Sequence, residues 1–338
     1  MIGEIIERVV NRQDLAPVDM EAALDQILAG NVSEAQIAAF VVALRMKGET
    51  VDEIAAAARA MRSRCTPIRP RVEGPLLDTC GTGGDGLQTF NISTASAIVV
   101  AAAGVSVAKH GNRAATSKAG SADVLEALGV RIDLEPDRVQ ASIEQVGIGF
   151  LFAQAHHAAL RHAAPVRRQL VGRTIFNMLG PLSNPAGATH QLIGVYAGAP
   201  IERLARALGE LGLERAWVVR GDDGLDEVSP QGRTVIAQWD GGDVSLTSLT
   251  PDAFGLEPVA VESLRGGDAA ENAAIIRDVL EGKPGAPRTA ILINAAAGLC
   301  VAGVETDPER AARRVADAID SGDAQRLLAR WAEFSESP

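Results

Sequence analysis

Apolar positions in the first 64 residues recur at helical spacing, and polar breaks divide them into four short segments. Pro17 can begin the second helix. Ser33 with Gln36 forms a capping box at the start of the third helix. Thr50 with Glu53 forms another at the start of the fourth. The pattern predicts a small all-helical N-terminal domain, which needs a partner surface because four short helices bury little by themselves.

Beyond residue 66 short apolar runs alternate with helical segments, which predicts a larger α/β domain with a central, mostly parallel sheet flanked by helices. Strands are expected to end at Thr79 and to span residues 105–109, 148–152, 192–195 and 217–219, before a hairpin of 235–239 and 244–246. Helices are expected over residues 136–146, 201–211, 269–280, 289–302, 308–321 and 324–334. A further basic helical stretch runs from His156 to Leu170, and Pro165 is expected to break or kink it.

Polar residues follow two successive strands in the stretch from Asp78 to Gly129. The first strand leads into a Gly-rich loop over residues 81–86, and the second leads to Lys109 and Arg113. Ligands of parallel sheets bind at the carboxyl ends of strands. Backbone N–H groups of a Gly-rich loop and a helix N-terminus form an anion site. The stretch therefore predicts a phosphate or pyrophosphate held between two loops, while simple solvation of the strand ends stays open.

The Gly-rich loop contains a G-x-G-x-x-G pattern at Gly81, Gly83 and Gly86, which alone is a weak signal. A dinucleotide-binding fold would place an acidic residue about 20 positions later, and none stands there. Asp85 inside the loop would repel a bare pyrophosphate. It suits a ribose hydroxyl, or phosphates screened by a divalent cation. No P-loop pattern is present.

The composition narrows the class of partner. A formal net charge of −11 and 3% aromatic residues oppose a general nucleic-acid-binding role, which needs a basic face and stacking platforms. Cys65, Cys80 and Cys300 fit no metal-binding spacing, and free thiols suggest a reducing cytoplasm. No signal peptide pattern is seen, and the apolar run over residues 98–107 is too short to cross a bilayer, so no membrane partner is expected.

Acidic residues cluster in a turn that follows the strand at 217–219. Asp226 and Glu227 are ligands that Mg²⁺ prefers, together with substrate phosphates. The residues alone leave a solvated acidic turn open, and Asp222 and Asp223 carry the same charge. Arg167, taken alone, is typical of a solvated basic helix face.

A series of motifs then occurs in one order along the chain: GTGGDGLQTFNIST, KHGNRAATSKAGSADVLEALG, VRRQL followed by RTIFNMLGPLSNPA, GLDEVSP and NAAAGLCVAG. In this order they resemble the anthranilate phosphoribosyltransferase family over nearly the whole chain. The resemblance implies a helical domain of residues 1–66 joined by about 155–188. It also implies that residues 67–154 and 189–338 form an α/β domain that binds phosphoribosyl pyrophosphate.

The resemblance assigns site residues. Those implied for phosphoribosyl pyrophosphate are Gly81, Gly84, Asp85, Thr89, Asn91, Ile92, Ser93, Thr94, Lys109, His110, Gly111, Asn112, Arg113, Ala114, Ala115, Thr116, Ser117 and Ser121. Those implied for anthranilate are Gly81, His110, Asn112 and Arg167, the last as a fork for the carboxylate. The implied metal ligands are Ser93, Asp226 and Glu227, for one or two Mg²⁺ ions per monomer.

Three residues depart from the usual family pattern. Thr116 stands where Ser is more usual and keeps the hydroxyl, so little change is expected. Gln154 and Ala158 stand where Pro is frequent, which alters the expected shape of the acceptor entrance.

The implied reaction joins the amine of anthranilate to the ribose C1 of phosphoribosyl pyrophosphate and releases pyrophosphate, in tryptophan biosynthesis. No catalytic acid or base is assigned, because an arylamine is already a neutral nucleophile and a sugar centre reacts through an oxocarbenium-like state. The family also implies a homodimer through the helical domain. Two rivals remain: a pyrimidine nucleoside phosphorylase of similar architecture, and a non-catalytic nucleic-acid-binding relative of the same fold.

Overall fold

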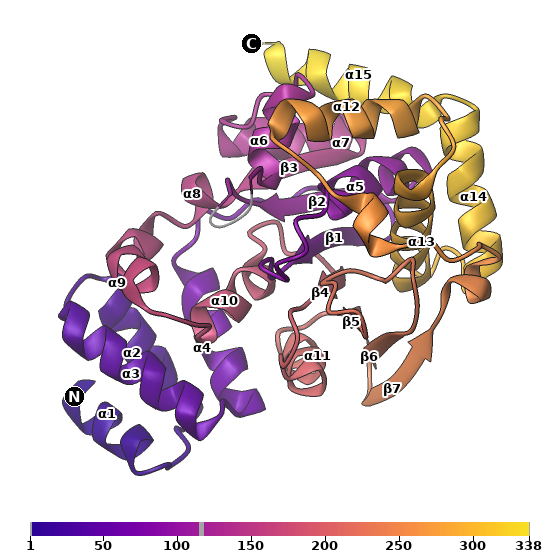
Figure 1. The fold of residues 1–338 in the computed structure, drawn as a ribbon. Helices are drawn as coiled ribbons and strands as arrows, with labels where there is room; N and C mark the ends of the chain where they lie inside the picture. Colours follow the sequence, from indigo (N-terminus) through magenta and orange to yellow (C-terminus); the bar gives the residue numbers. More distant parts are fainter. Residues whose placement is uncertain (1, 115–117, 338) are drawn as a thin grey trace.

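The computed structural model describes residues 2–114 and 118–337 of the chain. Figure 1 shows a group of helices at one end of the molecule and a sheet covered by helices at the other, with the N-terminus in the first and the C-terminus on the second. Within the described residues, no helix is both long and apolar enough to cross a membrane.

Four helices form the N-terminal part, as the apolar spacing predicts. They are α1 (Ile2–Val10), α2 (Pro17–Leu28), α3 (Glu34–Lys47) and α4 (Val51–Ser63). Both predicted capping boxes are confirmed: the Ser33 and Thr50 side chains accept from the backbone N–H of Gln36 and Glu53. Apolar side chains of all four helices meet in one buried cluster.

A later segment of the chain returns to these helices. It comprises α8 (Ala153–His156), a 3₁₀ turn over Ala158–His162, α9 (Ala164–Gln169) and α10 (Ile175–Leu179). Val166 and Phe176 join the cluster that contains Phe40 and Leu44, and Figure 1 shows α9 and α10 beside α3 and α4. This packing supports the division at about residues 66, 155 and 188, which stays a prediction.

The expected break near Pro165 is confirmed, but it falls before the proline, at Ala163. Pro165 stands in the first turn of α9, where its missing N–H would have had no helical partner and its fixed φ suits the helix. The stretch from His156 to Leu170 is accordingly three short segments, and the proline begins the last of them.

The described residues form one seven-stranded sheet in the order β3-β2-β1-β4-β5-β6-β7. Strands β1 to β5 run parallel, and β6 and β7 continue the sheet as an antiparallel hairpin. The fold class predicted from the sequence is confirmed. The bounds are β1 (Leu76–Gly81), β2 (Ser106–Gly111), β3 (Ile148–Phe152), β4 (His190–Gly194), β5 (Arg215–Gly221), β6 (Thr234–Asp240) and β7 (Val244–Leu249).

Successive side chains of the central strands point to opposite faces of the sheet, as the pleat requires. Leu192 and Val219 join the core beneath α5, α13, α14 and α15. Ile193 and Val218 join the core shared by α11 and the helical group, which comprises α1–α4 and the returning segment α8–α10. The remaining helices are α5 (Ile92–Ala102), α6 (Ser121–Ala127), α7 (Pro136–Val146), α11 (Ile201–Glu210), α12 (Ala269–Leu280), α13 (Ala286–Val301), α14 (Pro308–Asp320) and α15 (Asp323–Glu336).

Candidate active site

Four neighbouring strands end on glycine at one edge of the sheet: β2 at Gly111, β1 at Gly81, β4 at Gly194 and β5 at Gly221. Loops pack directly on these ends. A Cβ at Gly194 would lie 1.6 Å from the carbonyl oxygen of Asp226. The chain leaves β1 toward β2 on one side and leaves the neighbouring strand β4 toward β5 on the other, and such a switch point opens a crevice at the carboxyl ends of the strands.

The Gly-rich loop after β1 is anchored at its base and shaped by glycine. The Thr82 N–H donates to the Gly194 carbonyl at 2.9 Å. Gly83 and Gly84 have φ values of +68° and +78°, a region that other residues rarely adopt. Asp85 Oδ1 accepts from the Leu87 N–H at 3.0 Å, while its Oδ2 is buried with no hydrogen-bond partner among the described atoms. The loop therefore brings N–H groups and one carboxylate to the crevice.

The start of α5 faces the same loop. The predicted residues Asn91, Ile92, Ser93 and Thr94 lie at this helix N-terminus, which carries unpaired N–H groups and a positive dipole end. Ile92 and Thr94 side chains are buried, so only their backbone can serve a ligand. Thr89, just before the helix, pairs with Arg265 in an isolated bridge.

Asp226 and Glu227 lie in the turn after β5 and point toward β1 and α5. Glu227 Oε1 accepts from the Ser93 N–H at 3.1 Å. Burial raises the pKa of Asp226 to about 7, and the negative charge of Asp85 adds to this effect. Burial and the charge of Asp226 raise the pKa of Glu227 to about 8. Three carboxyl groups thus crowd one crevice, an arrangement that a divalent cation would relieve.

Lys109 forms the floor of the crevice. The side chain of this β2 residue is 2% exposed, and its ammonium donates to the Thr79 carbonyl and to Ser93 Oγ, the latter at 3.4 Å. Beside it, buried Asp78 accepts from the His110 N–H at 3.1 Å and from Gln191 Nε2 at 3.1 Å. The charge of Lys109 is therefore held between backbone, hydroxyl and carboxylate.

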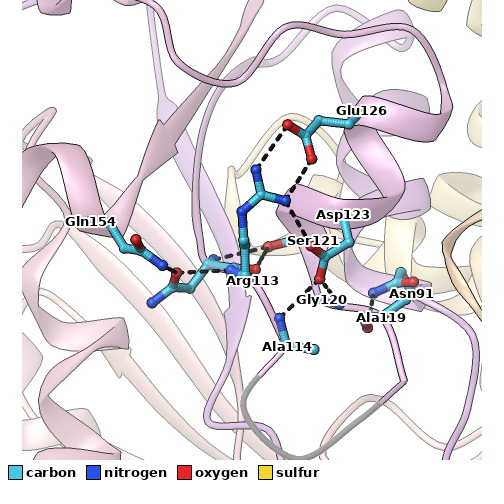
Figure 2. A network of polar contacts seen from close by, with 10 residues as sticks. Asn91, Arg113, Ala114, Ala119, Gly120, Ser121, Asp123, Glu126 and Gln154 are labelled. Atoms are coloured by element: carbon cyan, nitrogen blue, oxygen red, sulfur yellow. Dashed lines mark hydrogen bonds and ion pairs between the residues drawn. The ribbon is translucent and has the colours of Figure 1, made fainter. Parts of the chain in front are cut away.

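The loop after β2 is held by an acidic pair on α6, as Figure 2 shows. The Arg113 guanidinium donates to Asp123 at 2.9 Å and to both carboxylate oxygens of Glu126, at 2.6 and 2.9 Å. Asp123 also accepts from the N–H groups of Ala114 and Gly120. Arg113 thus meets two carboxylates on α6, and its pairing partly neutralises the positive charge expected in the crevice. The predicted residues Ala115, Thr116 and Ser117 lie outside the described part of the chain.

A second group of residues lies on the helical side of the β2 end. The rings of His110 and His157 lie 5.2 Å apart, and Nε2 of each is buried with no hydrogen-bond partner among the described atoms. Burial lowers the pKa of both histidines to about 3, so both rings are neutral at physiological pH. Among the described residues, two ring nitrogens therefore lie buried and unpaired on this side of the β2 end.

The predicted acceptor residues are only partly brought into contact. Asn112 bonds backbone and side-chain groups of its own loop, where the Ser121 hydroxyl accepts its N–H at 3.1 Å, and its Oδ1 accepts from Gln154 Nε2 at 3.3 Å (Figure 2). Arg167 lies on α9, exposed, with its guanidinium carbon 5.9 Å from the centre of the Phe176 ring. Within the described residues, no hydrogen bond or ion pair of its side chain is found, although its backbone N–H donates to the Ala163 carbonyl at 3.0 Å.

Comparison with known proteins bears directly on this geometry. Residues 3–65 match the helical bundle domain of a glycosyl transferase family, and residues 73–325 match the a/b domain of the same family. The anthranilate phosphoribosyltransferase of Geobacter sp. (strain M21) is 50% identical, with 98% of this chain and 97% of that protein covered. This chain belongs to the anthranilate phosphoribosyltransferase family.

Solved structures of anthranilate phosphoribosyltransferases have the same fold as this chain. The Thermus thermophilus enzyme superposes with a TM-score of 0.93 at 42% identity, covering 98% of this chain and 99% of that one. The Saccharomyces cerevisiae enzyme in complex with PRPP and Mg superposes with a TM-score of 0.90 at 28% identity, covering 100% and 98%. Both domains of the anthranilate phosphoribosyltransferase fold are therefore present here.

Two residues at the crevice escaped the sequence analysis. Arg173 contacts the Gly-rich loop, and Tyr196 lies beneath its guanidinium. Arg173 stands in the quoted motif RTIFNMLGPLSNPA, but nothing in its spacing indicates which loop it meets. Tyr196 could have been noticed because it is the one tyrosine in the 338 residues and stands two positions after a strand that ends on glycine.

Proposed function

We propose that this chain transfers the phosphoribosyl group of 5-phosphoribosyl 1-pyrophosphate to the amine of anthranilate, giving N-(5-phosphoribosyl)anthranilate and pyrophosphate in tryptophan biosynthesis. One observation carries the proposal. The Gly-rich loop, the start of α5 and the Asp226–Glu227 turn meet at the β1–β4 switch point. This crevice offers N–H donors for an anion beside carboxylates for a cation, which a pyrophosphate with its counter-ion requires.

We propose Mg²⁺ at the carboxylates, one or two ions per monomer, held by Ser93, Asp226 and Glu227. The unpartnered Asp85 Oδ2 and the raised pKa values of Asp226 and Glu227 support a cation in this crevice. The described residues hold no group of three or more His, Cys, Asp or Glu side chains arranged for a metal. This fits Mg²⁺, which usually takes one or two carboxylates and completes its coordination with water and substrate phosphates. When bound, the ion would stabilise the charge of departing pyrophosphate.

The protein residues contribute binding, orientation and electrostatics. The predicted phosphate residues within the described part of the chain, Gly81 to Ala114 and Ser121, would offer the anion N–H groups, Lys109 and hydroxyls. On the acceptor side, His110, Asn112 and Arg167 hold anthranilate, with the Arg167 fork on its carboxylate. The rings of His110 and His157 are neutral, so neither adds positive charge to the acceptor side. The amine then attacks the ribose C1 without a dedicated general base.

Loss of anthranilate fluorescence tests the reaction. The purified protein should consume anthranilate only when phosphoribosyl pyrophosphate and Mg²⁺ are both present. Turnover of thymidine with phosphate, and none of anthranilate, would replace this function with the phosphorylase. Retention of single-stranded DNA without any turnover would favour the non-catalytic relative.

We further propose a homodimer formed through the helical group, in the cytoplasm. Val42 and Met46 are 39% and 71% exposed and share one face of α3, one helical turn apart. Val10 and Val18 on α1 and α2 are also exposed, and three free thiols suit a reducing compartment. Light scattering at micromolar concentration should give twice the chain mass, and Val42→Lys with Met46→Lys should give the monomer. A monomer for the unsubstituted protein would contradict the assembly.

A further inference from the structure

Arg173 connects the helical group with the Gly-rich loop. It lies in the segment between α9 and α10, directly before Thr174, which caps α10. Its guanidinium donates from Nη1 to the Gly83 carbonyl at 2.9 Å and from Nη2 to the Gly84 carbonyl. One planar fork thus binds two consecutive carbonyls of a loop 90 residues earlier in the chain.

Tyr196 fixes the other side of the same fork. The Arg173 guanidinium carbon lies 3.9 Å from the centre of the Tyr196 ring, close enough for a cation–π contact. Tyr196 itself follows β4, and its N–H donates to Thr82 Oγ1 at 3.1 Å, one residue before the carbonyls that Arg173 binds. The fork is therefore held in place by the loop's own neighbour rather than free to swing into solvent.

The two carbonyl contacts have a geometric consequence for the N–H groups of the loop. Peptide bonds are planar, and the described residues contain no cis peptide, so each N–H points opposite to the carbonyl of the same peptide. Holding the Gly83 and Gly84 carbonyls toward Arg173 directs the N–H groups of Gly84 and Asp85 away from it. Glycines at positive φ are also the residues that lose most conformational freedom when a loop becomes ordered, so a tether matters most there.

We infer that Arg173 is a positioning residue of the pyrophosphate site: it turns the Gly83 and Gly84 carbonyls out of the crevice so that the N–H groups of Gly84 and Asp85 face the anion. This inference rests on the proposed function for the identity of the anion. It also makes the loop depend on a residue carried by the segment that packs on the helical group. The acceptor side and the pyrophosphate side are thereby joined through one side chain.

Crowding at Gly84 supports the assignment. A Cβ built there would lie 2.5 Å from Arg173 Nη2, so the loop backbone and the guanidinium already touch without intervening space. An arginine that merely covered Tyr196 would not need this contact.

Two variants and one control test the inference. Arg173→Gln removes the charge and the fork, and Arg173→Lys keeps a point charge without the planar fork. Arg206→Ala, which removes an arginine from an exposed ion pair with Asp243, is the matched control. The KM for phosphoribosyl pyrophosphate should rise roughly ten- to hundredfold in Arg173→Gln, and less in Arg173→Lys, because two charge-assisted hydrogen bonds are lost. The KM for anthranilate should stay within about twofold, as should both constants in the control.

Amide hydrogen exchange of the substrate-free protein gives a readout that does not depend on turnover. The amides of residues 82–86 should exchange faster in both Arg173 variants and not in Arg206→Ala. Equal rises in both KM values, or unchanged exchange in this loop, would overturn the inference. Absence of anthranilate turnover in the unsubstituted protein would instead overturn the proposed function, and the exchange data would still report on the tether.

Discussion

The Ser93 N–H donates to Glu227 Oε1 at 3.1 Å, joining the first turn of α5 to a turn 134 residues later in the chain. The N–H groups of a first helical turn have no helical partners, and the helix dipole favours an anion there. Even so, burial and the neighbouring Asp226 keep the pKa of Glu227 at about 8. The helix N-terminus therefore compensates only part of the free-energy cost of placing several carboxyl groups in this crevice. Substituting Asp226 and Glu227 tests whether they serve the reaction.

Removing the charges of the acidic pair should damage the pyrophosphate side of the reaction. Asp226→Asn with Glu227→Gln keeps the shape of both side chains but removes the charge of the two proposed metal ligands. The kcat/KM for phosphoribosyl pyrophosphate should fall by more than roughly a hundredfold, since a metal supplies several kcal/mol of charge stabilisation. The Mg²⁺ concentration needed for half-maximal rate should rise. Steady-state kinetics at several Mg²⁺ concentrations measures both.

Removing the Arg167 fork should damage the acceptor side. Arg167→Ala should lower kcat/KM for anthranilate roughly ten- to hundredfold, because a charge-assisted hydrogen bond is worth about 1.5–3 kcal/mol. Its Mg²⁺ dependence should stay that of the unsubstituted protein. If the acidic-pair variant and Arg167→Ala were equally defective toward both substrates, the division of roles would fail.

Two buried histidines, His110 and His157, should make the protein sensitive to mild acid. Their pKa values near 3 lie below the usual 6.5, so the unfolded chain takes up protons that the folded protein does not. Stability is therefore lost as pH falls from about 6.5 toward 3. At pH 5 each neutral histidine costs about 2 kcal/mol. In His157→Gln, urea unfolding should show a loss between pH 7 and pH 5 that is about 2 kcal/mol smaller; an unchanged loss would contradict the prediction.

The close approach of β4 to the acidic turn should leave no room for a methyl group. Gly194→Ala would place Cβ against the Asp226 carbonyl, so the turn must move. Unfolding free energy should fall by about 3 kcal/mol, with a matching loss of activity. Gly232→Ala is the control, since no atom lies within 4 Å of its added Cβ, and it should change stability by less than about 0.5 kcal/mol. Equal effects of the two substitutions would refute the steric argument.

Glu53 should be essential to the helical group. Its side chain is fully buried, pairs with Lys47 at 2.8 Å and accepts from the N–H groups of Leu15 and Thr50. Glu53→Ala leaves the two N–H groups without this acceptor and leaves Lys47 with Asp14 as its remaining ion-pair partner, so it should cost about 3–5 kcal/mol in urea unfolding. Glu21→Ala removes an exposed pair with Arg59 and should cost less than about 1 kcal/mol. A small effect at Glu53 would mean that water replaces the carboxylate.

Local sequence patterns predicted most of the fold, because helix caps and helix starts depend on residues that are close together in the sequence. The caps at Ser33 and Thr50 and the start of α7 at Pro136 involve residues within one helical turn of each other. The break near Pro165 was predicted but its position was not, because a proline that interrupts a helix and one that begins it look alike until the start of the helix is known. The end of β1 at Gly81 rather than Thr79 depends on pairing with β4, which is a tertiary contact.

The site was predicted less completely than the fold. Functional residues that lie within one loop, such as the glycines at 83 and 84 or the acidic pair at 226 and 227, can be recognised in the sequence. Contacts between residues of different loops cannot. Neither the two carboxylates that Arg113 meets nor the carbonyls that Arg173 binds follow from spacing. The residue roles assigned by resemblance to the family stay predictions until the kinetics above are measured.

The return of α9 and α10 to the first four helices has a consequence for synthesis on the ribosome. The end of α4 at Ser63 emerges roughly 100 residues before α9 begins at Ala164. At about 5–20 residues per second, the apolar sides of α3 and α4 wait on the order of 5–20 s for Val166 and Phe176 to cover them. During that interval the nascent helices present an uncovered apolar surface, so a chaperone or a second nascent chain can reach it before the protein's own segment does.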